Sequence, residues 1–120
     1  MGSRWYAVVV DATDPARLAR WWAEVLDLRI LEEDANDVII GAGEDVHPIL
    51  YFSKNGDAKH GKNRLHIDLS PDDRDAEVER LVNMGARHVD IGQGERSWVV
   101  LADPEGNEFC VLRSRPVAAP

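Results

Sequence analysis

The stretch YAVVVDATDPARLARWWAEVL, residues 6–26, has a counterpart later in the chain, LHIDLSPDDRDAEVERLV, residues 65–82. Each stretch passes from a short apolar run through an Asp-containing turn into an amphipathic segment. Asp14 and Asp73 mark the two turns and lie 59 residues apart, and Tyr51 and Cys110 are separated by the same interval. A self-match at a fixed period predicts a duplicated structural unit.

The first copy predicts one helix and four strands. Asp14 can cap a helix that begins at Pro15, since Asp favours the cap and Pro suits the first turn. Leu18, Trp21 and Trp22 then recur at helical spacing and form one apolar face. Short β-branched and apolar runs predict strands over Tyr6–Val10, Leu28–Leu31, Asp37–Ile40 and Ile49–Phe52.

The second copy repeats this order. Asp73 is the expected cap of its helix, although Ser70 together with Asp73 also fits a capping box, and Gly85 is a plausible stop. In the first strand we expect Leu65, Ile67 and Leu69 to face the helix, with His66 and Asp68 on the other side. The predicted strands are Arg64–Leu69, Arg87–Ile91, Ser97–Ala102 and Glu108–Leu112.

The pattern is β-α-β-β-β written twice, which predicts an α+β fold. Two tandem βαβββ modules would pair their uncovered sheet faces as a half-open barrel with a cleft, because an apolar sheet face must be buried. The expected single domain, residues 1–120, divides into module one (5–53), a linker (54–63), module two (64–114) and a tail (115–120). Such a cleft is where a ligand would bind.

The composition of the chain narrows the range of functions to consider. The chain carries 14 basic and 22 acidic residues, a net charge of −8, which argues against nucleic acid as a partner. The acidic balance would suit a cationic small molecule, although an acidic surface that serves solubility is the commoner reason for it. Cys110 is the only cysteine, so no intrachain disulfide forms. No apolar run is long enough for a membrane helix and no signal-peptide pattern opens the chain, so we expect no membrane partner and a cytoplasmic location.

Over about Tyr6 to Arg113 the sequence resembles the vicinal oxygen chelate superfamily, which includes glyoxalase I, extradiol dioxygenases and bleomycin-resistance proteins. The resemblance rests on DATDPARLARWWAEVL (11–26), KNRLHIDLSPDD (62–73) and WVVLADPEGNEFCVL (98–112). The last two are similar to the glyoxalase-like subgroup common in actinobacteria. The resemblance implies paired βαβββ modules, a ligand in the cleft, and a homodimer as the expected assembly.

The resemblance also implies positions for a divalent metal. Metal-dependent members take two ligands from each module, and the equivalent positions here are Ala7, Tyr51, His66 and Cys110. Ala7 has no donor atom, and Tyr51 is a poor ligand for hard divalent ions. His66 and Cys110 are possible ligands of an incomplete set, so we do not favour a metal, and no cofactor is otherwise indicated.

Three hypotheses follow. The first, which we favour, is a small-molecule binder without the full metal-ligand set. Its expected contacts are Trp5, Ala7, Tyr51, His66, Asp68, Trp98 and Cys110. The second is a lyase, isomerase or dioxygenase-type enzyme, in which His66 and Glu108 would be the catalytic acid–base residues or a metal would stabilise an enolate-like oxyanion. The third is a non-catalytic dimeric domain.

Overall fold

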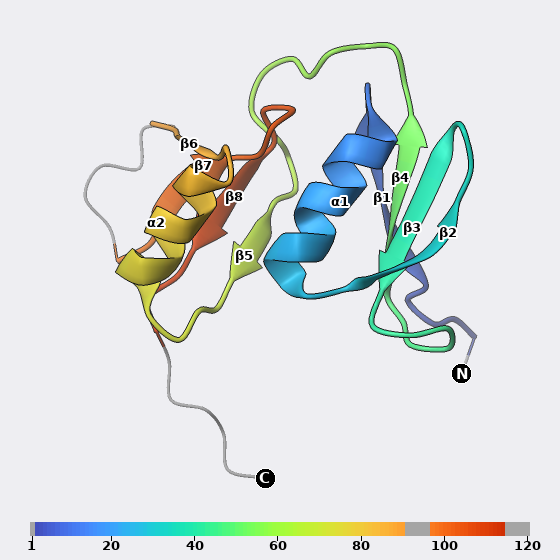
Figure 1. Cartoon of the computed structure of the whole chain (residues 1–120), viewed down its shortest axis with the longest axis horizontal. Helices are drawn as coiled ribbons and strands as arrows, with labels where there is room; N and C mark the ends of the chain where they lie inside the picture. Colours follow the sequence, from blue (N-terminus) through green and yellow to red (C-terminus); the bar gives the residue numbers. More distant parts are fainter. Residues whose placement is uncertain (1, 91–96, 115–120) are drawn as a thin grey trace, which may run out of the picture. The chain divides into compact units, whose positions relative to one another are not determined.

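The computed structural model describes residues 2–90 and 97–114. The chain divides into two compact units, the first ending at Ala58 and the second beginning at Lys59 (Figure 1). The elements are β1 (Ala7–Ala12), α1 (Pro15–Leu26), β2 (Arg29–Glu33), β3 (Asp37–Gly41), β4 (Ile49–Lys54), β5 (Ile67–Leu69), α2 (Arg74–Asn83), β6 (Arg87–His88), β7 (Val99–Ala102) and β8 (Glu108–Val111). This is an α+β fold in which each unit holds one helix and one four-stranded sheet.

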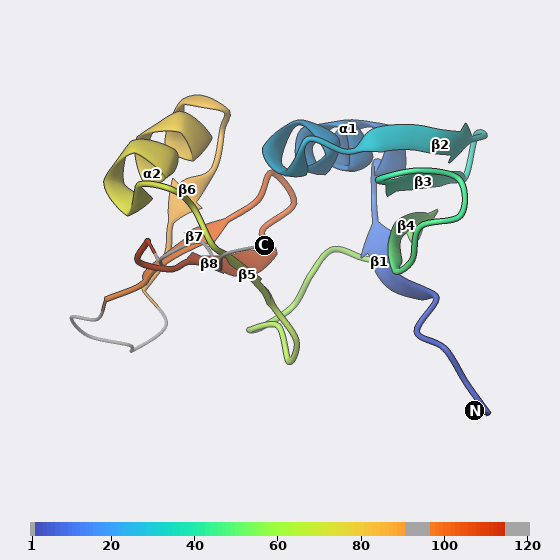
Figure 2. The ribbon, with the colours of Figure 1, turned by 90° about the horizontal axis from the view of Figure 1, so that it is seen from below.

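In the first unit the strand order is β1-β4-β3-β2, with β1 parallel to β4 and the other pairs antiparallel. Figure 2 shows α1 lying along one face of this sheet. The helix-facing layer contains the fully buried side chains of Leu18, Val38, Ile40 and Phe52. Alternation along each strand sends the neighbouring side chains to the opposite face, which no helix of this unit covers.

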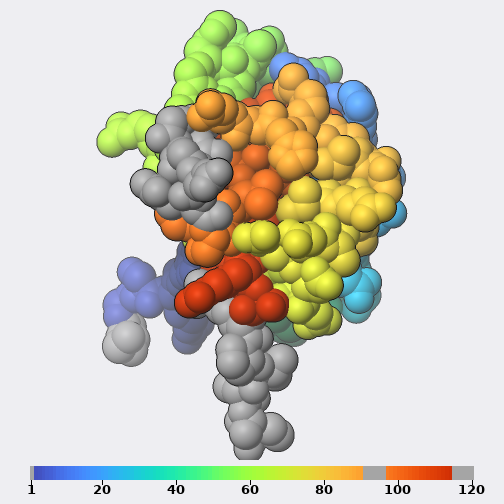
Figure 3. Space-filling model, turned by 90° about the vertical axis from the view of Figure 1, so that its left-hand side faces the viewer, coloured from blue at the N-terminus to red at the C-terminus, as the bar shows by residue number. Residues whose placement is uncertain are grey.

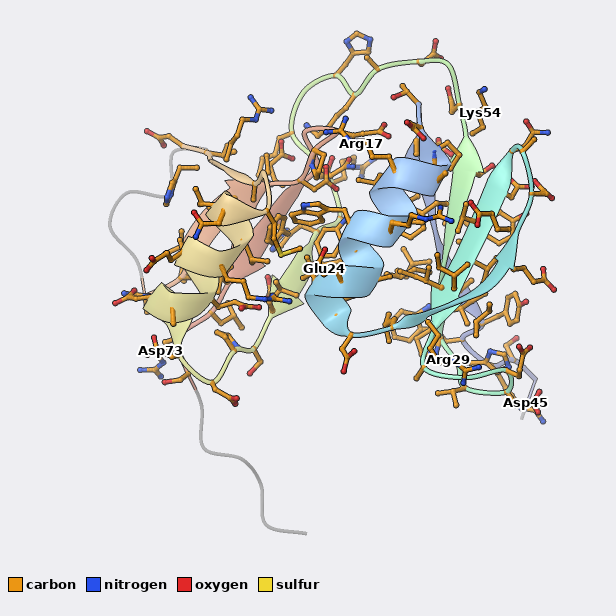
Figure 4. All side chains as sticks on the ribbon, viewed as in Figure 1. Arg17, Glu24, Arg29, Asp45, Lys54 and Asp73 are labelled. Carbon is orange, nitrogen blue, oxygen red and sulfur yellow. The ribbon has the colours of Figure 1, made fainter. Side chains whose placement is uncertain are left out.

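Helix α1 begins and ends as local chemistry dictates. The Asp14 carboxylate accepts a hydrogen bond from the Arg17 N–H at 3.2 Å, and Pro15 opens the first turn (Figure 4). Trp21 and Trp22 are both buried and meet edge to face, with ring centroids 5.0 Å apart. The helix ends at Asp27, which adopts the left-handed conformation at φ 53°. No stop was predicted at this position, because Gly rather than Asp is the usual residue in that conformation.

In the second unit the strand order is β5-β8-β7-β6, again with one parallel pair, β5 and β8. The Asp73 carboxylate caps α2 by accepting from the Ala76 N–H at 3.1 Å (Figure 4), and Gly85 follows the helix with φ 106°, as its position predicts. Helix α2 and the strand after it lie on the surface seen in Figure 3. The core of this unit contains Leu69, Leu81, Leu101, Phe109 and Val111.

The strand registers of the two units repeat at the interval found in the sequence. Val9 pairs with Tyr51 between β1 and β4, and Asp68 pairs with Cys110 between β5 and β8. Both members of the pair are displaced by 59 residues, so the duplication extends to individual backbone hydrogen-bonding positions. A side chain at a given position in one unit therefore has a defined structural counterpart in the other.

Two predictions about strand ends are wrong. Strand β5 begins at Ile67, not Arg64, and Leu65 is 85% exposed rather than packed against the helix. The reason is that the register pairs Ile67 with Phe109, so Arg64 and Leu65 would lie opposite residues of the turn before β8, where no strand can pair with them. The predicted first strand, Tyr6–Val10, is β1 at Ala7–Ala12, and Trp5 precedes it and is 67% exposed.

Some predictions fall outside the described residues, namely the Ile91 end of the predicted strand 87–91 and the tail 115–120. Among the described residues, neither helix has the length and apolar character needed to cross a membrane.

Candidate functional site

The first unit presents a row of side chains across the sheet face opposite α1. Tyr51 of β4 pairs with Val9 on one side and with Ile39 on the other, and Ile39 pairs with Glu32 of β2. Residues paired across neighbouring strands point to the same face. The sequence therefore builds a continuous strip that is apolar and aromatic at one end and acidic at the other.

A hollow of about 430 Å³ lies on this face. Its lining is Glu32, Glu33, Asp34, Asp37, Ile39 and Tyr51. Interaction of the Tyr51 hydroxyl with the Asp37 carboxylate, together with burial and the other nearby carboxylates, raises the pKa of Tyr51. The hollow therefore combines an apolar and aromatic floor, formed by Ile39 and Tyr51, with a wall of acidic residues.

Local contacts hold two further carboxylates near the hollow. Glu33 pairs with Val38, whose side chain faces α1, and the Glu33 carboxylate forms a two-pronged ion pair with Arg20 of α1, with N–O distances of 2.7 and 2.8 Å, so this charge is directed away from the open face. Asp34 accepts hydrogen bonds from the backbone N–H groups of Asn36 and Asp37, which lower the pKa of Asp34. No basic residue is among those that line the hollow. The electrostatic potential there favours a cation.

In the second unit, the row of side chains equivalent to that of Val9 and Tyr51 has a different chemical character. Asp68 of β5 pairs with Cys110 of β8, and Cys110 pairs with Val100 of β7. His66, just before β5, brings its Nε2 to 3.1 Å from Asp68 Oδ1. One donor atom from each of His66, Asp68 and Cys110 lies within 4.8 Å of the other two. The structure thus brings together three of the predicted site residues.

Cys110 is buried, and its thiol donates a hydrogen bond to the Asp68 carboxylate. Burial raises the pKa of the Cys110 thiol, the negative charge of Asp68 raises it further, and the charge of Lys62 opposes the shift in part. A thiol in this state is a weak nucleophile, because the thiolate is the reactive form. A bound metal ion would reverse this, since it deprotonates a coordinating thiol.

The donor atoms decide which metal sites are compatible with the chain. Imidazole, carboxylate and thiolate are ligands of borderline ions such as Zn²⁺. The counterparts of His66, Asp68 and Cys110 in the first unit are Ala7, Val9 and Tyr51, which add no strong ligand. A four-ligand set shared between the two repeats does not fit this chain, whereas a three-donor site within the second unit does.

Glu108, predicted as a catalytic acid–base residue, has both carboxylate oxygens engaged. Oε2 is 2.7 Å from Lys59 Nζ, and Oε1 accepts from the Asn63 N–H at 2.7 Å. Burial acts to raise the pKa of Glu108, but the Asn63 N–H and the Lys59 ammonium outweigh it and hold the pKa below its usual range. The Glu108 side chain is only 11% exposed, and its charge is paired with residues of its own unit.

The remaining predicted contacts belong to both units. Ala7 lies at the start of β1 and is half-buried, Trp98 immediately precedes β7 and is half-buried, and Trp5 is exposed before β1. Sequence reasoning missed Asp37 and Ile39 at the hollow and Lys59 beside Glu108. The acidic run Glu32-Glu33-Asp34 followed by Asp37 carried a signal for the hollow, since the predicted hairpin brings it alongside the strand of Tyr51.

The family model for the glyoxalase-like domain matches residues 7–112. The chain belongs to this family and therefore to the vicinal oxygen chelate superfamily that the sequence motifs indicated. No curated protein sequence matches the chain.

Solved structures show the same fold. A glyoxalase/bleomycin resistance protein/dioxygenase family enzyme from Burkholderia phytofirmans PsJN is 16% identical, with 88% of this chain and 94% of that chain covered and a TM-score of 0.67. The trypanothione-dependent glyoxalase I of Leishmania major is 19% identical, with coverages of 93% and 87% and a TM-score of 0.71. A bleomycin resistance determinant encoded on the transposon Tn5 is 17% identical, with coverages of 95% and 100% and a TM-score of 0.61. At these identities the likeness concerns the fold.

Proposed function

We propose that this glyoxalase-like domain binds a small aromatic cation on the open sheet face of its first unit. The observation that carries this proposal is the hollow in which Tyr51 and Ile39 lie beside the Asp37 carboxylate. Aromatic side chains and carboxylates together favour organic cations, because both attract positive charge and the ring also provides contact area. The net charge of −8 adds long-range attraction for the same class of ligand.

The predicted role of Tyr51 as a ligand contact is retained in this proposal. Tyr51 and Asp37 line the same hollow and interact closely enough for Asp37 to raise the pKa of Tyr51, so one ligand could contact the ring and the carboxylate together. Fold neighbours include both a bleomycin resistance determinant and a glyoxalase I, so proteins with different functions share this fold. The proposal therefore rests on the site of this chain and not on either neighbour.

The test is a calorimetric titration with benzyltrimethylammonium and with its neutral isostere neopentylbenzene. We expect saturable binding of the cation, weakened by added salt, and at least tenfold weaker binding of the neutral compound, a difference of about 1.4 kcal/mol. Asp37→Asn should weaken cation binding by about tenfold, whereas Asp45→Asn, an equal charge change in an exposed loop of the same unit, should leave it unchanged. Equal binding of the two compounds, or equal effects of the two variants, would overturn the proposal.

A second candidate function is metal binding by the second unit, and one observation favours it: the convergence of His66, Asp68 and Cys110. These three residues would hold a borderline ion such as Zn²⁺, which supplies Lewis-acid stabilisation of an oxyanion when bound. In the metal-free form of the enzyme hypothesis, His66 would instead be the acid–base residue, with Asp68 at 3.1 Å orienting its imidazole.

Metal analysis of protein purified without chelator tests this second candidate. We expect stoichiometric Zn²⁺ or a rise in melting temperature when Zn²⁺ is added, since binding to the folded state stabilises it. Cys110→Ala should abolish both effects, while Cys110→Ser tests whether sulfur itself is needed. Absence of bound metal together with an unchanged melting temperature would exclude the candidate.

We also retain the homodimer as a proposal. It is supported by Trp5, Tyr6 and Val9, three large apolar side chains that are at least 58% exposed at the start of the first unit. Sedimentation velocity over a hundredfold range of protein concentration should show a dimer that Val9→Glu disrupts. A monomer at every concentration would contradict this proposal.

A further inference from the structure

Directly after strand β4 comes the one asparagine of the chain that a glycine follows. Asn55 and Gly56 succeed Lys54, the last residue of β4 (Figure 4), whereas the other four asparagines precede Asp, Arg, Met or Glu. Asparagine is among the thermolabile residues, because the backbone nitrogen of the next residue can attack its side-chain amide. A following glycine hinders this attack least, since it has no Cβ. The sequence therefore singles out Asn55, and the local structure decides whether the folded chain permits the reaction.

The Asn55 side chain is folded against the Gly56 peptide. Its Oδ1 accepts a hydrogen bond from the Asp57 N–H at 2.9 Å, and its Nδ2 donates to Asp11 Oδ2 at 3.4 Å. The first contact forms an Asx turn, in which the side-chain carbonyl replaces a backbone carbonyl. The Asp57 N–H also draws electron density from the amide carbon Cγ. The turn thus keeps an activated Cγ close to the Gly56 nitrogen.

The Gly56 nitrogen is available for the attack. Within residues 2–90 and 97–114, the Gly56 N–H donates no hydrogen bond, whereas the N–H groups of Asn55 and Asp57 on either side both do. Gly56 is exposed, and no atom beyond its neighbouring residues lies within 4 Å of the position that a Cβ would take. An amide nitrogen that is neither paired nor crowded is the nucleophile that this reaction needs.

We propose that Asn55-Gly56 is a site of spontaneous covalent modification, at which Asn55 becomes aspartate or isoaspartate while the chain stays folded. The Gly56 nitrogen loses its proton to solvent and bonds to Asn55 Cγ, the Cγ–Nδ2 bond breaks, and Nδ2 takes up a proton and leaves as ammonia. Water then opens the resulting succinimide at either carbonyl. The net change consumes one water and converts an amide to a carboxylate and ammonium. It needs neither a ligand in the hollow nor a metal in the second unit.

The modification alters a position that closes one end of the first sheet. The Asn55 N–H donates to the Ala12 carbonyl at 2.8 Å, which continues the β1–β4 pairing beyond its last register pair, Ala12 and Lys54. Aspartate would place a carboxylate where the amide donated to Asp11, so two like charges would meet. Isoaspartate would add a methylene group to the main chain. Both products therefore loosen the junction at which β1 ends and leads into α1.

The test is peptide mapping by mass spectrometry after incubation of the folded full chain near neutral pH. We expect the change from amide to acid at Asn55 to be at least about tenfold faster than at any other asparagine, and to give both isomers. Gly56→Ala adds a methyl group in open space at a position without positive φ, and should slow the change about tenfold or more. Gly43→Ala, in the loop before β4 and in ordinary contact with Val46 at 3.5 Å, is the control and should leave the Asn55 rate unchanged.

A second comparison separates reaction in the folded state from reaction after unfolding. The free energy of unfolding gives the unfolded fraction, and this fraction multiplied by the rate in urea gives the rate through global unfolding. The rate in the folded chain should exceed this product about tenfold or more, because the site reacts without global opening. A rate equal to the product, an Asn55 rate no higher than those of the other asparagines, or equal effects of the two glycine variants would overturn the proposal.

The effect of the product on the sheet is tested with Asn55→Asp. We expect this variant to have a lower urea midpoint than the wild type, and a smaller loss in a chain that carries Asp11→Asn, because the like charge is then absent. No loss, or the same loss in both backgrounds, would contradict the claim that the product loosens the junction.

Discussion

The two units have the same backbone and different chemistry at equivalent places. Val9 and Tyr51 form a cross-strand pair in the first unit, and Asp68 and Cys110 form the same pair in the second. The first pair belongs to an aromatic and acidic surface, while the second belongs to a cluster of metal-ligand types. In both units the residues that face the helix are needed for packing. The residues on the opposite sheet face are not, so the two units can carry different functions there.

The largest expected effect tests the difference between the two sheet faces of one unit. Phe52 is fully buried against α1. The substitution Phe52→Ala should lower the free energy of unfolding by about 3–5 kcal/mol, because it leaves a cavity. Val9→Ala, on the opposite face and 60% exposed, should cost less than about 0.5 kcal/mol. Urea unfolding of the two variants measures both; similar costs would show that the open face is also packed.

The next prediction compares the turns that precede the last strand of each unit. Asp103 is 1% exposed, and its Oδ1 accepts hydrogen bonds from the N–H groups of Glu105 and Asn107. Asp103→Ala leaves these donors without their acceptor and should cost about 1–3 kcal/mol. Asp45→Ala, in the exposed connection before β4, should change the unfolding free energy by less than about 0.5 kcal/mol. A small cost for Asp103→Ala would mean that the turn holds without its side chain.

A third prediction compares the ion pairs of the two units by their pH dependence. The pKa of Glu108 is lower in the folded chain than in the unfolded one, so its contribution to stability is full above the unfolded pKa. This contribution is lost as the pH falls from the ordinary glutamate pKa through the lower, folded value. Glu108→Gln should therefore flatten the acid side of the stability profile measured by urea unfolding.

The control for this profile is Glu33→Gln. Glu33 is exposed and pairs with Arg20 at the surface, where solvent screens the interaction. Arg20 lowers the pKa of Glu33 as well, so Glu33→Gln should also flatten the acid side of the profile, but less than Glu108→Gln does because the pair is exposed. If Glu33→Gln flattens the profile as much as Glu108→Gln does, the contrast between a shielded and an exposed pair is wrong.

The smallest expected effect concerns Tyr51. The Asp37 hydrogen bond raises the pKa of Tyr51, so its phenol should ionise at higher pH than free tyrosine. The chain has two tyrosines, and the difference in absorbance titration between the wild type and Tyr51→Phe isolates the Tyr51 signal. Asp37→Asn should return this signal toward the ordinary range, and an unchanged titration would show that Asp37 is not its partner.

The sequence predicted the parts of the fold that depend on local rules. Asp14 and Asp73 cap the helices, and Gly85 follows the second helix, because each of these roles is set by a residue and its immediate neighbours. The interval of 59 residues predicted that Tyr51 and Cys110 occupy equivalent positions in the two copies, and the strand registers confirm this. These features need no knowledge of distant contacts.

The parts that sequence reasoning missed depend on contacts across the chain. Glu108 was considered as an acid–base residue because it shares a strand face with Cys110, and its ion pair with Lys59, which lies 49 residues earlier, was not foreseen. Leu65 was placed in a strand by alternation, yet it would lie opposite the turn before β8 and the strand starts later. A single sequence does not show which long-range partner a charged side chain takes, so these assignments required coordinates.

One measurement tests most directly the claim that equivalent rows of the two units carry different chemistry. Amide chemical shifts are followed by NMR while benzyltrimethylammonium and Zn²⁺ are each titrated into the full chain. The account predicts saturable shifts at Ile39 and Tyr51 with the organic cation, and at Asp68 and Cys110 with Zn²⁺. Shifts of the same row with both titrants, or saturable shifts with neither, would contradict it.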